Sequence, residues 1–388
     1  MLHRGNHKRW LKRIARVLKY TLVIVGCVVL IPMVVALGRV GLECRPWSSG
    51  RAAQTSAAGV AEASRRAQPT VGLPSYARSE DQTYLTLPEW YIVYSADEYA
   101  AFIAHQRPSR FPYFRAVGQF WQSYYDVCAV TRDHYAFNGG YHLSLAVIGT
   151  SFTIENILKG LYENTVGRLA EWLSSPVLTE EDAYARAVAV EYGGFLHTVP
   201  WYEFPFGAKL GGLWRDTPFF GHNIIRKAER KGALSVEYGT KAGYGWAIRQ
   251  ATQGVYAAED LQINAWVEGL TPELMAQEPD VRIVRPIDGQ AAIIALPRYE
   301  AFTQIVPRLS RHGVRFVEIA GNDEILVTLI APQAWAYDLR AGQALFAMPI
   351  LTQPEHKRVA IKVPVALLHR VLNDLADGPI TLEHIYDY

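Results

Sequence analysis

Cysteine is scarce in this sequence: Cys27, Cys44 and Cys128 are the only three among 388 residues. No two of them have the Cys-x-x-Cys spacing of a redox motif or a zinc site, so a disulfide framework and a cysteine-based metal site are excluded. Cys27 lies inside an uncharged run of the chain. The sequence therefore allows at most one intrachain disulfide beyond that run, between Cys44 and Cys128.

Common catalytic and cofactor-binding motifs are also missing. The sequence has no His-Glu-x-x-His, no Walker motif and no Gly-x-Gly-x-x-Gly after a strand; residues 137–142 (FNGGYH) hold two glycines but no lysine. We therefore predict no metal and no cofactor. A metal site would have to combine residues that lack any regular spacing, namely His134, His142, His197 and His222 with Glu155, Glu191 or Glu203.

Charge is absent from residues 21–38 (TLVIVGCVVLIPMVVALG). Eighteen residues form a helix of about 27 Å, just enough to cross the hydrocarbon core of a bilayer. Residues 1–20 contain seven Lys or Arg and no acid. Under the positive-inside rule, we expect residues 1–20 in the cytoplasm, a transmembrane anchor at 21–38 and residues 39–388 on the far side.

Two alternatives compete with an uncleaved anchor. Ala36 and Gly38 form the small-x-small pattern of a signal-peptide cleavage site, but the apolar run is longer than a signal core of about 7–15 residues. A buried helix of a soluble protein is the other alternative, although no residue of the run is polar enough to face water. We favour the anchor.

The remainder of the chain carries an acidic excess. Residues 81–388 hold 26 basic and 34 acidic side chains, a net charge of −8. Because proteins that bind nucleic acid present a basic face, we predict no nucleic-acid partner. The expected partners are the lipid bilayer through residues 21–38, and an envelope protein or a second copy of the chain.

The composition divides the chain after the anchor. Residues 39–80 are rich in small residues and poor in large apolar ones, which predicts a flexible tether. Residues 81–270 are aromatic-rich and predict a mainly helical domain. Within it we expect helix starts at Ser95 and Thr179, each three residues before an acid, and long helices over 142–172 and 223–252.

The C-terminal domain, residues 281–388, repeats itself. Residues 291–320 and 358–386 each read as a strand ending in proline, an amphipathic helix, a glycine and a second strand. Two further strands are expected between them, at 325–330 and 344–351, with 321–324 as a hairpin turn. This order of elements resembles the ferredoxin-like class. The fold prediction is thus α+β, with a duplicated ferredoxin-like sandwich whose antiparallel sheet carries both helices on one face.

The stretch HTVPWYEFPF, residues 197–206, is the first candidate for chemistry. His197 and Glu203 among four aromatic rings would be partly desolvated and suited to general acid–base catalysis. The competing interpretation is that the rings anchor a loop and that His197 bonds a backbone carbonyl. Trp201 and Tyr202 are candidate ligand-binding residues, as is Arg110, because residues 107–115 combine arginines with aromatics that suit an acidic headgroup or a sugar.

Other polar patterns have structural explanations that compete with functional ones. Glu155, Lys159 and Glu163 follow one helical stripe, which either lines a polar groove or forms ion pairs on a solvated face. Glu318 and Glu383 each follow the repeat glycine by five residues, and either form a symmetric site or face solvent.

These patterns predict a single-pass, membrane-anchored extracytoplasmic protein of binding or scaffold type, periplasmic if the cell is bacterial. The alternative is a membrane-tethered hydrolase or transferase that acts on lipid or glycan through the aromatic stretch around His197 and Glu203.

Overall fold

The computed structural model describes residues 31, 33–45, 82–135, 137–252, 261–336, 341–375 and 378–387. The expected cytoplasmic segment, residues 1–20, lies outside this part of the chain, as do most of the expected anchor (21–30 and 32) and the tether from residue 46 onward. Among the described residues, no helix combines the length and the apolarity needed to cross a bilayer.

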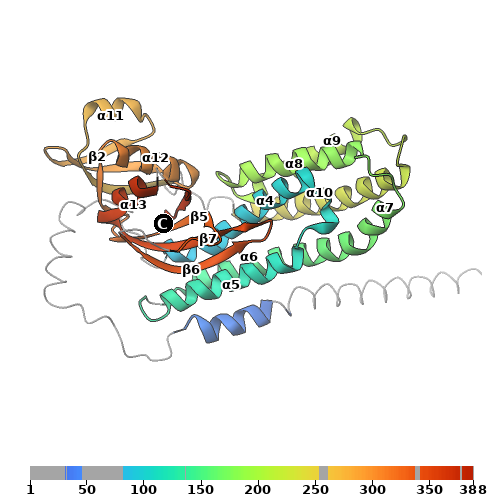
Figure 1. Ribbon diagram of the computed structural model, residues 1–388, viewed down its shortest axis with the longest axis horizontal. Coiled ribbons are helices and arrows are strands. Elements are labelled where there is room, and N and C mark those ends of the chain that lie inside the picture. The colour runs from blue at the N-terminus through green and yellow to red at the C-terminus, as the bar shows by residue number, and fades with distance from the viewer. Residues whose placement is uncertain are drawn as a thin grey trace, which may run out of the picture.

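The molecule has a helical region and a sheet region (Figure 1). Short segments of the helical region are α3 (Gln82–Leu85), the 3-10 turns η2 (Pro108–Arg110) and η4 (Trp201–Glu203), the π-helical η3 (Glu163–Gly167) and α7 (Arg168–Trp172). Its longer helices are α4 (Leu87–His105), α5 (Tyr113–Thr131), α6 (Gly139–Tyr162), α8 (Glu180–Leu196), α9 (Phe206–Asp216) and α10 (Ile224–Thr252).

Two of the predicted helix starts have different outcomes. Thr179 caps α8 with a complete capping box, in which its side chain accepts from the backbone of Asp182, so this prediction is confirmed. Ser95 lies in the middle of α4, so a helix start at Ser95 is wrong. The helix already begins at Leu87, where Pro88 suits the first turn because no hydrogen bond from its nitrogen is needed there.

Apart from the 3-10 turn η6 (Val365–Leu367), the sheet region contains eight strands and three helices among the described residues. They are β1 (Gln262–Glu268), α11 (Pro272–Gln277), β2 (Arg282–Asp288), β3 (Ala291–Pro297), α12 (Glu300–Arg311), β4 (Arg315–Ile319), β5 (Glu324–Pro332), β6 (Gln343–Ile350), β7 (Gln353–Pro364), α13 (Leu368–Leu375) and β8 (Thr381–Ile385). The strands form two antiparallel sheets, in the orders β2-β3-β1-β4 and β6-β7-β5-β8.

The predicted single sheet is therefore wrong, because each repeat supplies half of its own sheet. β3 and β4, which flank α12, belong to the first sheet, and β7 and β8, which flank α13, belong to the second. Residues 321–324 do not form a hairpin; they connect β4 of one sheet to β5 of the other. Strand β1 was not expected, since residues 262–268 fall at the end of the stretch assigned to the helical domain.

The two sheets share one apolar core. Side chains from β1 and β3, from β5 and β7, and from α12 and α13 all pack in it. Helix α12 contacts β8 of the second sheet and α13 contacts β4 of the first, so the contacts between the two halves are reciprocal. The second sheet also contacts the helical region through Leu326, Met348 and Ala360, which leaves β5 covered on both faces.

The strand register corrects the predicted equivalence of Glu318 and Glu383. Glu318 lies opposite Trp266, whereas the matching position of the second sheet, opposite Thr328, is His384. Glu383 is the residue skipped at the bulge of β8. Both glutamates are largely buried, so neither marks a solvent-facing side of its strand.

Candidate functional site

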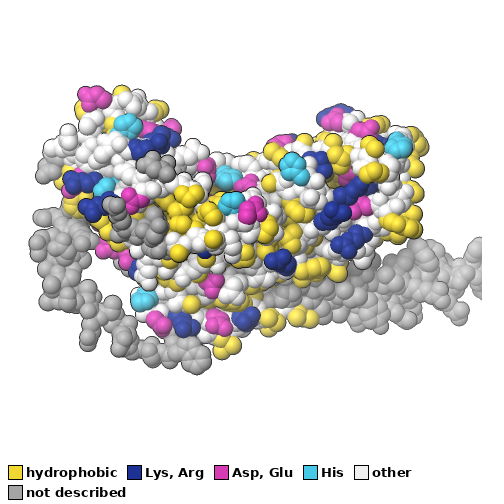
Figure 2. Space-filling view, in the orientation of Figure 1, with side chains coloured by type: hydrophobic (Ala, Val, Ile, Leu, Met, Phe, Trp, Pro, Cys, Tyr) yellow, Lys and Arg dark blue, Asp and Glu magenta, His cyan; other side chains and the backbone are white. Residues whose placement is uncertain are grey.

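One group of polar and aromatic residues lies where α4 contacts the sheet region. Trp90, Tyr94, Asp97 and Glu98 follow one another at helical spacing and therefore share one side of α4. This side contacts α8 and the strands β5, β7 and β8. Figure 2 shows histidine and acidic side chains in the hollow between the two regions.

His197 joins three helices at this junction. It caps the C-terminal end of α8, its Nε2 lies 2.7 Å from Oδ2 of Asp97, and its Nδ1 lies 3.1 Å from Oε2 of Glu300. Hydrogen bonds that His197 donates to Asp97 and Glu300 raise the pKa of His197 to about 10, although partial burial opposes this rise. The ring is thus an imidazolium at neutral pH, with both N–H groups donating to carboxylates, and we call this set the His197 clamp.

The backbone around the His197 clamp is closely fitted. Gly193 lets α8 approach α4, because a Cβ at this position would lie 2.5 Å from Oδ1 of Asp97. Tyr299, immediately before Glu300, has a φ of 64°, which is costly for a tyrosine. Its backbone N–H donates to Asp387, which stabilises this conformation and directs Glu300 toward His197.

His384 has the opposite protonation state. Burial lowers its pKa to about 3, so the ring is neutral. Its Nδ1 lies 2.9 Å from Oγ1 of Thr303, and its ring centroid lies 3.6 Å from that of Trp90. Because Thr303 and His384 are both buried, this hydroxyl–imidazole pair is closed to a substrate.

Arg358 completes the junction from β7. Its guanidinium bonds Glu383 at 2.6 Å and Glu98 at 3.2 Å, and it lies 4.2 Å from the ring centroid of Tyr94. Burial raises the pKa of Glu98, while Arg358 opposes that rise. A buried arginine with two carboxylate partners fixes the orientation of α4 on the sheet, because separating them would leave unpaired charges.

The helical region also contains a cavity of about 100 Å³ between α4, α6, α8 and α10. Four tyrosines and two lysines line it: Tyr99, Tyr113, Tyr192, Tyr238, Lys159 and Lys241. Phe206, from the end of the HTVPWYEFPF stretch, forms part of the same wall. We call this space the helical cavity.

Ion pairs neutralise the lysines of the helical cavity. Lys159 lies 2.8 Å from Glu237, and Lys241 lies 2.7 Å from Glu155. Burial opposes ionisation of Glu237, but the two ammonium groups lower its pKa to about 2. The expected ion pairing among Glu155, Lys159 and Glu163 on a solvated face is therefore wrong, since these side chains pair with α10 instead.

The predicted site residues are not brought together. Glu203 is exposed, and both ring nitrogens of His197 are occupied by Asp97 and Glu300 rather than by a backbone carbonyl. Trp201 and Tyr202 pack against α10, where the Trp201 ring contacts Tyr244. Arg110 is exposed and donates to Gln106.

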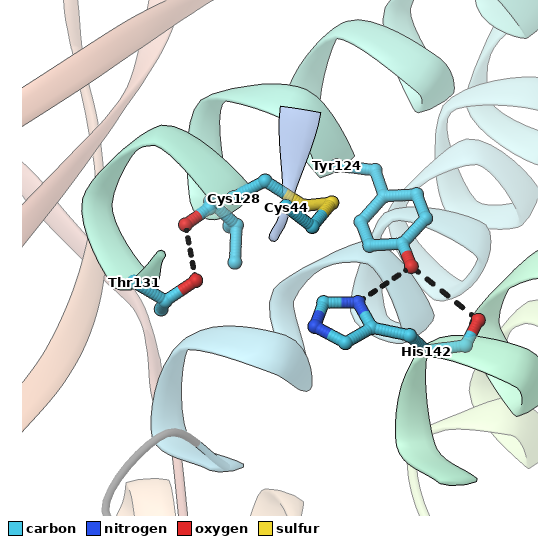
Figure 3. Close-up of a disulfide and its surroundings, with 6 residues drawn as sticks. Cys44, Tyr124, Cys128, Thr131 and His142 are labelled. Atoms are coloured by element: carbon cyan, nitrogen blue, oxygen red, sulfur yellow. Dashed lines mark hydrogen bonds between the residues drawn. A yellow bond between two sulfur atoms is a disulfide. The ribbon is translucent and has the colours of Figure 1, made fainter. Parts of the chain in front are cut away.

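The histidines considered for a metal are dispersed. His134 is exposed, and His222 bonds Ser175. His142 lies close to Cys44 and Cys128, and these three form the one group of possible metal ligands among the described residues. The Nδ1 of His142 also lies 2.8 Å from the hydroxyl of Tyr124. The two sulfur atoms are bonded to each other, so they offer no thiolate to a metal (Figure 3).

The Cys44–Cys128 disulfide joins the N-terminal helix to the body of the molecule. Residues 33–43 are helical, and Val40 and Cys44 pack against Tyr124 and Val127 of α5. Residues 39–45, assigned to the tether from their composition, are thus held against α5. Cys44–Cys128 is the one intrachain disulfide that the sequence allowed beyond the uncharged run, and the structure contains it.

No protein-family model, curated protein or solved structure matches this chain.

Proposed function

We infer that this chain is a membrane-anchored, extracytoplasmic protein of binding or scaffold type, with its sheets forming a tandem of ferredoxin-like units. The observation that carries this proposal is the Cys44–Cys128 disulfide. Disulfides persist in oxidising compartments and are rare in the cytosol. This one begins six residues after the uncharged run 21–38, so it ties the expected anchor to the folded body.

The strand orders support the tandem. The first sheet has the connectivity β-α-β-β-α-β with the order β2-β3-β1-β4, which is that of a ferredoxin-like unit. The second sheet repeats this order, although no helix is described between β5 and β6.

The geometry supports binding rather than catalysis. A general base needs a free lone pair, and the His197 imidazolium has none because it donates to two carboxylates. The helical cavity offers apolar and aromatic walls with compensated charges, which suits a small neutral or zwitterionic molecule. The hydrolase or transferase alternative gains no support from this arrangement.

Thiol labelling of the protein in membrane fractions tests the proposal. One cysteine of three should react with a mass-tagged maleimide before reduction, and all three after reduction, in denatured membrane fractions. A C-terminal reporter enzyme that works only in an oxidising compartment should be active. Three reactive thiols before reduction, together with an inactive reporter, would refute the extracytoplasmic location.

A further inference from the structure

Exposed apolar side chains gather at the end of the helical region that lies farthest from the sheets. Leu169 and Trp172 lie in α7, Val177 follows it, Phe219 and Phe220 lie between α9 and α10, and Ile225 lies in the first turn of α10. Trp172 is 80% exposed and Phe220 is 78% exposed. We call these six residues the apolar tip, and Figure 2 shows hydrophobic side chains at this end of the molecule.

Hydrogen bonds hold the loops of the apolar tip together. Asn223 has a φ of 62°, and its side chain accepts from the backbone of Ser175 and donates to the carbonyl of Val177, both at 3.0 Å. The loops before α8 and before α10 therefore form one surface. The exposed rings belong to a fixed structure rather than to two separate loops.

At this end of the helical region, charged side chains are buried and large apolar side chains are exposed. Next to exposed Ile225, the charged groups of α10 turn inward: Arg226 and Lys227 are each 1% exposed, Arg230 4% and Lys231 2%. They pair with Glu163, Asp182 and other buried acids. In water the reverse arrangement is usual, because charges are costly to bury and large apolar groups are costly to expose.

A basic rim borders the apolar tip. Arg107 donates to the carbonyl of Pro176 at 3.2 Å, in the loop that carries Val177, and Arg168 donates to the carbonyl of Ser109 at 3.5 Å. Arg110, at the end of η2, is exposed. The rim places positive charge beside exposed aromatic rings, a combination typical of segments that insert into an anionic membrane surface.

We propose that the apolar tip inserts into the surface of an anionic phospholipid bilayer and that the basic rim binds its headgroups. This rests on the proposed function, because the expected anchor at 21–38 is what brings a bilayer to the molecule. The disulfide at Cys44 holds the end of that run on α5 of the helical region. Isolated protruding rings fit a deformable lipid phase, whereas a second copy of the chain would need a complementary surface.

Photolabelling of the full chain tests this surface. The protein is reconstituted in vesicles of phosphatidylethanolamine and phosphatidylglycerol that contain a diazirine-bearing lipid, and labelled peptides are mapped by mass spectrometry. Peptides with Trp172 and Phe220 should be labelled several-fold more than the peptide with Ile283, an apolar residue of the sheet region that is 46% exposed. Phe220→Ser should lower labelling at the tip, Arg110→Gln should lower it only in vesicles that contain phosphatidylglycerol, and Ile283→Ser should change neither.

The outcomes separate the tip from the anchor. Lipid label at 21–38 but not at the tip would overturn the tip proposal and leave the anchor standing. Label at neither place would overturn both. A detergent-solubilised dimer that Phe220→Ser converts to a monomer, without lipid label at the tip, would assign this surface to a second copy of the chain.

Discussion

The far end of the helical region places its charged and apolar side chains differently from the core of the sheet region. In the sheet region, the side chains of β1, β3, β5 and β7 enclose an apolar core with α12 and α13. In the helical region, buried arginines and lysines of α10 pair with buried acids while Trp172 and Phe220 project outward. Burial of apolar surface accounts for the core of the sheet region, whereas the exposed rings at the far end of the helical region are the basis of the membrane contact that we propose.

Removing one buried charge should have the largest effect. Arg226 contacts Asp182 and Glu229 at 2.9 Å each, so Arg226→Met leaves buried carboxylates unpaired and should cost about 3–5 kcal/mol of the free energy of unfolding. Denaturant titration followed by circular dichroism measures this. Arg215→Met, at an exposed position, should leave the free energy unchanged. If Arg226→Met and Arg215→Met lowered the free energy of unfolding by the same small amount, the buried ion pairs would not stabilise the helical region.

Replacing a buried and an exposed phenylalanine should change the free energy of unfolding to different extents. Phe302 is fully buried in the sheet-region core, so Phe302→Ala should cost about 3–5 kcal/mol. Phe220→Ala should cost almost nothing in detergent, because the ring packs against little. Thermal unfolding of both variants checks the pair. A large loss in the Phe220 variant would show that the apolar tip is part of a core.

Removing the disulfide should have the next largest effect on the free energy of unfolding. The bond closes a loop of 84 residues, so Cys44→Ser combined with Cys128→Ser should lower the free energy of unfolding by about 2–4 kcal/mol. Cys27→Ser is the matched control and should not change it. The comparison is made by denaturant titration without reductant. Stability that does not depend on Cys44 and Cys128 would contradict a disulfide that ties the N-terminal helix to α5.

Removing the His197 clamp should have the smallest effect on the free energy of unfolding, and this effect should depend on pH. The pKa of His197 is raised from 6.5 to about 10, so its stabilisation is complete below pH 6.5 and is lost as the pH rises toward 10. His197→Gln should cost about 1–2 kcal/mol at pH 6, since Asp97 is partly screened by water, and should flatten this pH dependence. His134→Gln, at an exposed site, is the control. The same alkaline loss in both variants would exclude the His197 clamp as its cause.

Local patterns predicted many elements of the fold but not how they assemble. The strand at 291–297 and the capped helix after Thr179 follow from apolar runs and from a cap, both of which are local. Strand β1 was not predicted, because it is only seven residues long and lies outside the two sequence repeats. The repeat predicted an α+β region correctly, yet it could not show that the strands form two separate sheets.

The candidate site was the least predictable part. His197 stood out, but its partners Asp97 and Glu300 lie 100 and 103 residues away in sequence. Glu203, six residues from His197, is exposed at the end of η4, the turn that follows Pro200. The sequence does contain one indication of this site, since Asp97 falls on the same side of α4 as Trp90 and Tyr94.

Spin-label depth at position 220 measures whether the far end of the helical region, where rings are exposed and charges are buried, meets lipid. A nitroxide on Phe220→Cys, in the full chain with Cys27→Ser and reconstituted in phosphatidylethanolamine–phosphatidylglycerol vesicles, is compared with one on Ile283→Cys. The account predicts that oxygen relaxes the label at 220 more than a water-soluble nickel complex does, and that the order reverses at 283. Equal preference for the nickel complex at both positions would contradict it.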